Sequence, residues 1–278
     1  MSVKLREALS KDLLFVAMQP VVDLKNRRVF SHEALLRSKV PELKSPLTII
    51  EAAIANDFMG TLGRSLREMS LVACPDTALF INVNPAEFDE GWLVRPDDPI
   101  FRHDHPVFLE ITESVPLSHY RMCHGVLKEI RSKGVFLAID DLGAGYSNFK
   151  YIADLAPEIV KLDRELIAGV HKEPRLFKLV RSIVRLCEDL GAKVVAEGIE
   201  TIDELKAVVD SGCHYGQGFL LARPALPIPA VNWEVIDKVL GGTGGGQTGP
   251  GGKGGGPGGA GGGTPQRART VGSGRVGT

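Results

Sequence analysis

Short apolar runs and longer amphipathic stretches alternate along the first 240 residues of the chain. The short runs predict strands, and the stretches whose apolar residues recur about every 3.6 positions predict helices. Strands are predicted over residues 15–22, 29–36, 79–83, 107–111, 135–140, 159–162, 193–197 and 215–221. Helices are predicted over residues 46–58, 60–73, 118–133, 175–190, 202–211 and 228–240, with a short helix beginning at Ser147. Residues 86–106, rich in Pro, Asp and His, are predicted to be mostly irregular.

The connections between these elements indicate a barrel. Only the six residues Asp23–Arg28 join the first two strands, which is too few for a helical crossover, so this pair is predicted to be antiparallel. The later strands alternate with helices, which favours an α/β fold of the (β/α)8 TIM-like barrel type whose first strand runs backwards. An open doubly wound sheet is the alternative, but the phosphate-binding glycine motif that usually follows its first strand is absent from the sequence.

The end of the chain differs in kind from the rest. Residues 241–278 hold 19 of the chain's 32 glycines and no aromatic residue. Such a segment cannot bury enough apolar surface to offset the entropy of ordering it, so we predict a disordered glycine-rich tail. The tail carries four cations and no anion, and because the whole chain has a formal charge of −1, residues 1–240 carry −5. We therefore predict one folded domain over residues 1–240, followed by the tail.

Charge and composition exclude several classes of protein. A near-neutral charge and a pI near 6.7 argue against bulk binding to nucleic acid or to a membrane. The sequence shows neither a signal peptide nor an apolar run of about 18 residues, so no membrane span is predicted and a cytoplasmic location is expected. The four cysteines have no metal-type spacing and are predicted to be buried free thiols.

Seven of the apolar runs lead into polar residues that can bind metals or move protons. These residues are Glu33, Asn82, Glu110, Asp140 with Asp141, Lys161, Glu197 and Gln217. In a (β/α)8 barrel the carboxyl ends of the strands meet at one mouth, where active sites lie. Carboxylate and amide oxygens in this number suit hard cations such as Mg²⁺ or Mn²⁺. The pattern therefore predicts a metal-dependent active site at the barrel mouth.

The sequence blocks around these residues resemble one family. In order along the chain they are EALLR (33–37), INVNP (81–85), EITES (110–114), DDLGAGYS (140–147), KLD (161–163), AEGIET (196–201) and QGFLLARP (217–224). Over roughly residues 5–225 the chain resembles the EAL-domain family of cyclic-di-GMP phosphodiesterases. The resemblance implies metal-dependent hydrolysis of cyclic-di-GMP to linear pGpG, which lowers this second messenger in bacterial signalling. It also implies a homodimer.

The resemblance assigns ligands for a two-ion site of Mg²⁺ or Mn²⁺. Glu33, Asn82, Glu110 and Asp140 match the ligands of the first ion, and Asp140 together with Asp141 matches those of the second. Two such ions about 4 Å apart can activate a water molecule and stabilise the leaving oxygen of a phosphodiester. Packed carboxylates repel one another unless cations neutralise them, which also predicts dependence on metal.

Other roles are implied by the same resemblance. Lys161 matches the lysine that holds and polarises the attacking water, and Glu197 matches the proposed general base. Gln217 matches a glutamine that supports the site, and Arg37 matches a contact to a substrate phosphate. For Arg37, a salt bridge with a neighbouring acid is the alternative.

Two further acids and two histidines admit more than one interpretation. Glu113 and Glu200 match supporting acids of the family, and Glu113 matches the one that anchors a mobile loop, here residues 142–147. Glu200 also precedes a predicted helix, where its charge would favour the helix dipole without any role in the site. His103 and His105 flank Asp104 in a metal-like arrangement, but a Pro-rich surface loop is the favoured interpretation.

Two alternatives to a phosphodiesterase stay open at this point. An EAL domain can act as a cyclic-di-GMP sensor or a protein-docking module with little turnover, usually after losing metal ligands, whereas this chain keeps every one. A different metal-dependent barrel hydrolase is the second alternative, which the ordered motifs disfavour. The sequence contains no recognisable GGDEF, PAS or receiver domain, so regulation would come from an unidentified partner protein, from oligomeric state or from the tail.

Overall fold

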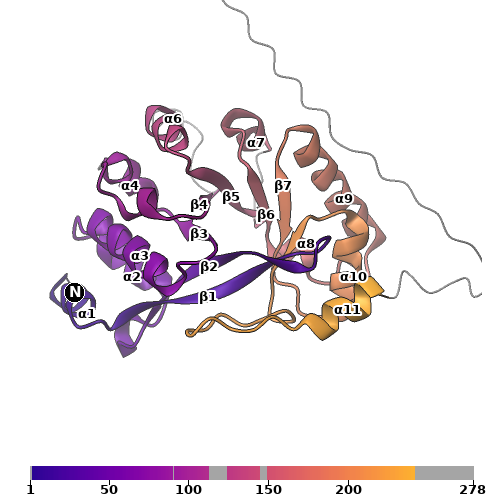
Figure 1. The fold of residues 1–278 in the computed structure, drawn as a ribbon, viewed down its shortest axis with the longest axis horizontal. Helices are drawn as coiled ribbons and strands as arrows, with labels where there is room; N and C mark the ends of the chain where they lie inside the picture. The colour runs from indigo at the N-terminus through magenta and orange to yellow at the C-terminus, as the bar shows by residue number, and fades with distance from the viewer. Residues whose placement is uncertain (1, 90, 113–123, 145–148, 242–278) are drawn as a thin grey trace, which may run out of the picture. The chain divides into compact units, whose positions relative to one another are not determined.

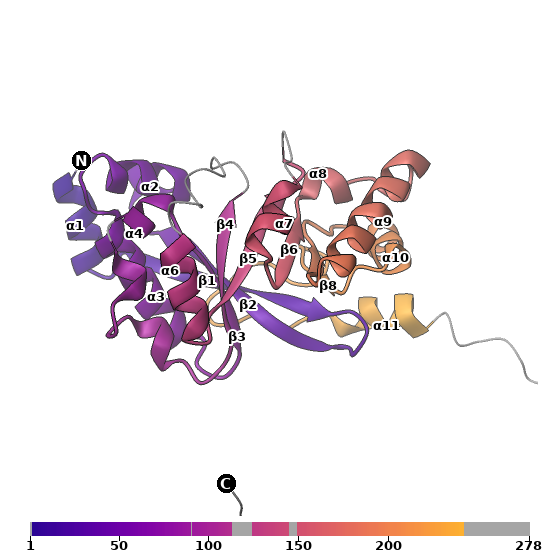
Figure 2. The same ribbon diagram turned by 90° about the horizontal axis from the view of Figure 1, so that it is seen from above.

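The computed structural model describes residues 2–89, 91–112, 124–144 and 149–241 of the chain. In this part eight strands close into a barrel in the order β1 to β8, and helices flank the barrel (Figures 1 and 2). The strands are β1 Leu14–Asp23, β2 Arg28–Ser38, β3 Ala78–Asn82, β4 Val107–Thr112, β5 Phe136–Leu142, β6 Ile159–Leu162, β7 Lys193–Ala196 and β8 Tyr215–Gly216. Strand β1 is antiparallel to both β2 and β8, and every other neighbouring pair is parallel. The predicted barrel with a reversed first strand is thus confirmed.

The helices follow the predicted order, with several additions. They are α1 Ser2–Ser10, α2 Pro46–Ile54, α3 Met59–Ala73, α4 Pro85–Asp89, α6 His124–Ser132, α7 Lys150–Leu155, α8 Arg164–Ile167, α9 Pro174–Asp189, α10 Ile202–Ser211 and α11 Trp233–Gly241, with short 3-10 helices η1 Pro41–Leu43, η2 Trp92–Val94 and η3 Pro99–Arg102. Helix α2 is shorter than predicted, and Asp57 adopts a positive φ of 49° between α2 and α3. Residues 86–106 contain α4, η2 and η3, which are too short to show a helical period in the sequence.

The last strand is much shorter than predicted, because the chain leaves the barrel after Gly216. Gly218 then lies so close to the backbone of Ile199 that a Cβ atom there would come within 2.2 Å of the Ile199 carbonyl oxygen. Further on, Ala225 and Met18 exchange two backbone hydrogen bonds. The apolar residues after Gly216 therefore belong to a segment that leaves the barrel and pairs with β1 at Met18. In the sequence they continue the apolar run of β8, and the predicted strand is longer for that reason.

The interior of the barrel contains an apolar layer beneath its mouth. Side chains alternate across a strand, so the residue two positions from each polar mouth residue shares its face. The buried members of this layer are Val21, Ala78, Phe80, Phe108, Ala138, Ile159, Val195 and Tyr215. The rings of Phe80 and Phe108 stack with centroids 4.7 Å apart. This layer closes the barrel below the mouth, so the polar residues meet solvent only from above.

Several smaller predictions are confirmed, and others fall outside the described residues. Cys74, Cys187 and Cys213 are buried free thiols, and Thr201 with Glu204 forms the capping box of α10. Among the described residues, no helix has the length and apolar character needed to cross a bilayer. Cys123, Ser147 and the predicted tail beyond Gly241 lie outside the part of the chain that the structure describes.

Candidate active site

The polar residues that end the strands converge on one cavity at the barrel mouth. Its volume is about 250 Å³. The cavity is lined by Gln19, Glu33, Leu35, Asp140, Asp141, Lys161, Arg164, Glu197, Gly198, Glu200, Gln217, Gly218 and Phe219. Glu110 and Asn82 adjoin it, since both contact its lining residues. The structure therefore brings together the residues that the sequence placed at the strand ends.

The ammonium group of Lys161 lies at the centre of this cluster. Its Nζ is 2.5 Å from Glu110 Oε1 and 2.6 Å from Glu197 Oε1. It is also 3.2 Å from Glu33 Oε2 and 3.1 Å from Asp140 Oδ1. Lys161 reaches this point from β6, and its side chain is 1% exposed. A single cation thus contacts carboxylates from four different strands or strand ends.

An aromatic floor supports Lys161 from below. The Nζ atom lies 5.7 Å from the centroid of the Phe80 ring, within the range of a cation–π interaction. Phe80 is two residues before Asn82 on β3 and is fully buried in the apolar layer. The ring therefore keeps water from reaching the ammonium group through the barrel.

A β-bulge lets two consecutive acids face the same cavity. In a regular strand, Asp140 and Asp141 would point to opposite faces. The register between β5 and β6 shifts between Ile139 and Leu142, and Asp141 has a positive φ of 57°. A bulge of this kind re-aims a side chain. As a result both carboxylates line the cavity, and the backbone at Asp141 carries the strain of a left-handed conformation at a non-glycine residue.

Burial and mutual repulsion shift the protonation of the acids. Burial raises the pKa of Glu110 well above its usual range, and the charge of Glu33 adds to this shift. Burial also raises the pKa of Glu197, and it raises the pKa of Asp141 to about 6 with help from Asp140. Burial alone would lower the pKa of Lys161, but the surrounding carboxylates, Asp140 first, raise it well above its usual range. The lysine therefore stays charged while the acids around it resist full ionisation.

Three amide side chains complete the cavity. Gln217 Nε2 donates to Glu33 Oε2 at 2.6 Å and to Gln19 Oε1 at 3.0 Å, and Gln19 Nε2 donates to the Ala222 carbonyl at 3.0 Å. Asn82 Nδ2 donates to Glu110 Oε2 at 2.8 Å. Sequence reasoning missed Gln19. Its signal is a polar residue inside the apolar run of the reversed strand, directly opposite Glu33 in the register of β1 and β2.

The donor set fits divalent cations. Asp140, Asp141 and Glu197 each place a carboxylate oxygen within 4.8 Å of the others, a spacing that could hold one ion. Glu33 and Glu110 bring the carboxylates around Lys161 to five, which leaves a strong excess of negative charge when all are ionised. Gln217 Oε1 is buried without a hydrogen-bond partner. Hard oxygen donors with uncompensated charge are the surroundings that Mg²⁺ or Mn²⁺ prefers. Asn82 presents its amide nitrogen here, so its oxygen would have to turn inward to act as a ligand.

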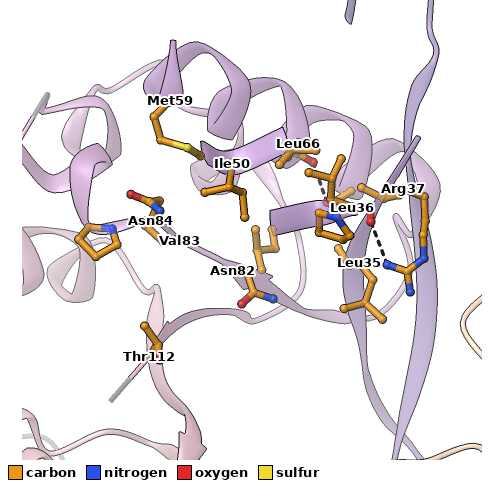
Figure 3. A pocket seen from close by; sticks show the side chains of 16 residues that line it. Leu35, Leu36, Arg37, Ile50, Met59, Leu66, Asn82, Val83, Asn84 and Thr112 are labelled. Carbon is orange, nitrogen blue, oxygen red and sulfur yellow. Dashed lines mark hydrogen bonds between the residues drawn. The ribbon is translucent and has the colours of Figure 1, made fainter. Parts of the chain in front are cut away.

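A second cavity of about 310 Å³ adjoins the first and shares Leu35 with it (Figure 3). Its walls are mostly apolar and come from β2, β3, α2 and α3, as the labelled side chains of Ile50, Met59 and Leu66 show. Arg37 lies at its edge and donates from Nη1 to the Leu36 carbonyl at 2.8 Å. Within the described residues Arg37 forms no ion pair, so the salt-bridge alternative finds no support there.

The remaining candidates lie in three different settings. Glu200 lines the first cavity and pairs with Arg164, its Oε2 accepting from Nη2 at 3.0 Å. Glu113 and part of the loop 142–147 lie outside the described residues. The Nε2 atom of His103 lies 2.9 Å from the Thr77 carbonyl, and the potential metal group found among the described residues contains neither His103 nor His105.

An aromatic–cation pair at the rim was not predicted. Phe219 is 46% exposed and lines the first cavity, and the guanidinium carbon of Arg223 lies 4.3 Å from the centroid of its ring. A large exposed aromatic beside an acidic cavity offers a flat apolar face to a ligand. The sequence carries no separate signal for it, since Phe219 reads as one more residue of the predicted last strand.

A comparison with protein families decides the membership of the chain. The model of the family described as the EAL domain matches residues 2–224. The chain belongs to the EAL domain family. The matched residues include all eight strands of the barrel.

Similar proteins include enzymes and ligand complexes. The cyclic di-GMP phosphodiesterase PA2567 of Pseudomonas aeruginosa is 31% identical over 228 residues, covering 77% of this chain and 39% of that protein. Klebsiella pneumoniae BlrP1 in complex with calcium and cyclic-di-GMP is 33% identical, with a TM-score of 0.70 over 81% of this chain and 59% of that one. Its manganese complex with cyclic-di-GMP gives a TM-score of 0.68 at 33% identity over 78% of this chain and 57% of that one. The chain therefore spans less than two fifths of the length of PA2567.

Proposed function

We propose that this EAL domain hydrolyses cyclic-di-GMP to linear pGpG in a reaction that depends on Mg²⁺ or Mn²⁺. The observation that carries the proposal is the cluster of five carboxylates around Lys161 at the barrel mouth. The similarity to a cyclic di-GMP phosphodiesterase and to structures that hold cyclic-di-GMP with manganese or calcium supports it.

Metal ligands come from the acids already described. Asp140 and Asp141 would hold one cation, and Glu33, Glu110 and Asn82 would contribute to a second beside Asp140. Glu197, whose carboxylate lies within 4.8 Å of Asp140 and Asp141, would stay free to act as a base. When bound, two divalent cations lower the pKa of a water molecule and neutralise the charge that develops on the phosphate. The apolar layer beneath the mouth keeps bulk water out of this region from below, which strengthens every electrostatic contact.

Residues of the chain itself would move the proton and orient the reactants. Glu197 would accept the proton of the attacking water, whose oxygen bonds to phosphorus while the bond from phosphorus to the 3′ oxygen breaks. The 3′ oxygen would take a proton from solvent and leave as the 3′ hydroxyl of pGpG. Burial is the first cause that raises the pKa of Glu197, and a raised pKa makes this carboxylate a better proton acceptor than an ordinary glutamate. Lys161, held between Glu197 and Glu110, would orient the water, and Gln217 would fix the carboxylate of Glu33.

The neighbouring apolar cavity would receive part of the substrate. A purine base is a flat apolar group with polar edges, and a cavity of about 310 Å³ can accept one. Arg37, at the edge of that cavity, would fork onto a phosphate oxygen between the two cavities. This arrangement would place the scissile phosphate over the acids of the first cavity and one base in the second.

The test is the release of pGpG by the purified chain. With Mg²⁺ or Mn²⁺ we expect cyclic-di-GMP to be converted to pGpG, and with a chelator we expect conversion to stop. Glu33→Ala removes a carboxylate that contacts Lys161 and Gln217, and it is expected to weaken both metal binding and turnover. If the protein bound cyclic-di-GMP but released no pGpG with either cation, the sensor or docking-module alternative would replace this proposal.

A further inference from the structure

A buried ion cluster lies behind the second cavity, between α3, α4 and η3. Arg67 of α3 is fully buried, and so are its two acidic partners, Glu87 and Asp98. Arg67 Nη1 donates to Glu87 Oε2 at 2.5 Å, and Nη2 donates to Asp98 Oδ2 at 2.9 Å. Arg67 Nε donates to both Asp98 oxygens at 3.1 Å. The guanidinium group thus holds two buried carboxylates that come from different segments.

Glu87 connects this cluster to the wall of the second cavity. Its free oxygen, Oε1, accepts a hydrogen bond from the backbone N–H of Asn84 at 3.1 Å. Asn84 lies in the turn between β3 and α4, and its own Oδ1 accepts from the Ala86 N–H at 3.0 Å. Residues Asn82 to Pro85 all line the cavity (Figure 3). Glu87 is therefore the link by which Arg67 can hold one wall of that cavity in place.

Asp98 shares the same cation but reaches a different part of the molecule. Its Oδ1 accepts from the Ile100 N–H at 3.2 Å and caps η3. Neither Asp98 nor η3 lines the second cavity. Glu87 and Asp98 are therefore equally buried and share Arg67 as a partner. Glu87 holds the cavity wall at Asn84, whereas Asp98 holds η3, so Asp98 serves as a control for Glu87.

The backbone of α3 is shaped to admit Glu87. A Cβ atom at Gly63 would lie 1.9 Å from Glu87 Oε2, so only glycine leaves room for the carboxylate at this helix position. Glycine in a helix interior costs about 1 kcal/mol relative to alanine. A destabilising residue placed against one carboxylate indicates that the position of that carboxylate matters to the fold or to the cavity.

We propose that Glu87 is a positioning residue for the ligand cavity: held by Arg67, it fixes the Asn84 N–H and with it the Asn82–Pro85 wall. This inference rests on the proposed function in one respect, because the ligand expected in the cavity is part of cyclic-di-GMP. The wall also carries Asn82, whose amide contacts Glu33 and Glu110, so the same turn joins the base-binding cavity to the acids.

The experiment compares Glu87→Gln with Asp98→Asn in the full chain. Each variant keeps the shape of the side chain and removes one buried negative charge from Arg67, so both are expected to lower thermal stability by similar amounts. Glu87→Gln is expected to raise KM for cyclic-di-GMP about tenfold, or about 1.4 kcal/mol, with kcat within about twofold of wild type. Asp98→Asn is expected to keep KM within about twofold. Equal changes in KM for the two variants, or none for Glu87→Gln, would overturn the proposal.

A second measurement separates this inference from the proposed activity. Backbone amide exchange at Asn84 is expected to be faster in Glu87→Gln than in Asp98→Asn, whether or not the protein turns over cyclic-di-GMP. If wild type neither binds nor cleaves the dinucleotide, the proposed function fails while the exchange result still decides the role of Glu87. Should Glu87→Gln not fold, Glu87→Asp keeps the charge for Arg67 but is too short to reach Asn84 as well, and the same differences from Asp98→Asn are expected.

Discussion

The domain contains two buried ion clusters of very different composition. Behind the second cavity, Arg67 faces the two carboxylates of Glu87 and Asp98, and all three side chains are fully buried. At the barrel mouth, Lys161 faces four carboxylates in direct contact, with Asp141 as a fifth acid nearby, and Asp140 and Glu197 remain 13% and 17% exposed. The first cluster is closed and nearly balanced in charge. The second is open on one side and strongly acidic.

The choice of cation follows the same division. A guanidinium group presents donors in a planar fork, and Arg67 uses that fork to bind Asp98 through two nitrogens. An ammonium group is a compact point charge, and Lys161 contacts four separate carboxylates without satisfying them fully. Burial alone therefore does not distinguish the functional cluster from the structural one. The functional cluster is distinguished by its excess of negative charge at the open barrel mouth, because only added cations can balance that charge.

The largest expected effect comes from removing the cation of the closed cluster. Arg67→Met leaves two carboxylates buried without a partner, which is expected to destabilise the domain by about 3–5 kcal/mol in urea unfolding. The matched control is Arg64→Met on the same helix. Arg64 pairs with Asp97 and Glu68, both of which are more than half exposed, and its loss is expected to cost about 1 kcal/mol or less. Similar losses in the two variants would mean that the buried cluster contributes no more than a surface pair.

Much of this contrast could be predicted from the sequence, and part of it could not. Glu33, Glu110, Asp140, Lys161 and Glu197 each end an apolar run, and strand ends meet at the mouth of a barrel, so the acidic cluster was predicted correctly. That both Asp140 and Asp141 face one cavity depends on a bulge, which has no sequence signal in the strand pattern. The roles assigned to these residues, the homodimer and the disordered tail remain predictions.

The closed cluster was not predicted at all. Arg67 and Asp98 are 31 residues apart in the sequence, and Asp98 lies in the stretch 86–106, which is predicted to be mostly irregular. A polar residue that is buried only because a distant partner satisfies it looks like any exposed polar residue in the sequence. Only the three-dimensional structure brings the partners together.

The next largest effect should fall on chemistry and leave the fold intact. Glu197→Gln keeps the size of the side chain but cannot accept a proton, so turnover of cyclic-di-GMP is expected to fall by about 10²-fold or more, or about 2.7 kcal/mol. Binding of the dinucleotide, measured by calorimetry, is expected to change little. Unlike Arg67→Met, this variant should unfold at nearly the wild-type urea concentration. Normal turnover would show that another group takes the proton.

Divalent cations should stabilise the open cluster and leave the closed one unaffected. A ligand that binds only the folded state at 100 times its Kd adds about 2.7 kcal/mol. We therefore expect Mn²⁺ or Mg²⁺ to raise the melting temperature of wild type, and Glu33→Ala to lose most of that rise. Asp98→Asn removes an acid from the closed cluster and is expected to keep the rise in full. A rise in melting temperature that survives in Glu33→Ala but not in Asp98→Asn would mean that the cation binds at the closed cluster around Arg67.

The smallest effect is expected from removing residues 242–278, because neither cluster draws on them. Every member of the two clusters lies between Glu33 and Gln217. Within the described residues, the last buried apolar side chains are Ile236 and Val239 of α11. Glycine makes up 18 of the 37 removed residues, and four others are cations, a composition that cannot bury enough surface to add stability. Truncation after Gly241 is expected to leave the melting temperature unchanged and the metal-dependent rate within about twofold at both low and moderate salt.

Truncation after Asn232 serves as the control, since it removes Ile236 and Val239 from the core and is expected to destabilise the domain by several kcal/mol. A large loss from the first truncation at both salt concentrations would mean that the tail packs against the domain or takes part in the site, and that its composition was interpreted wrongly.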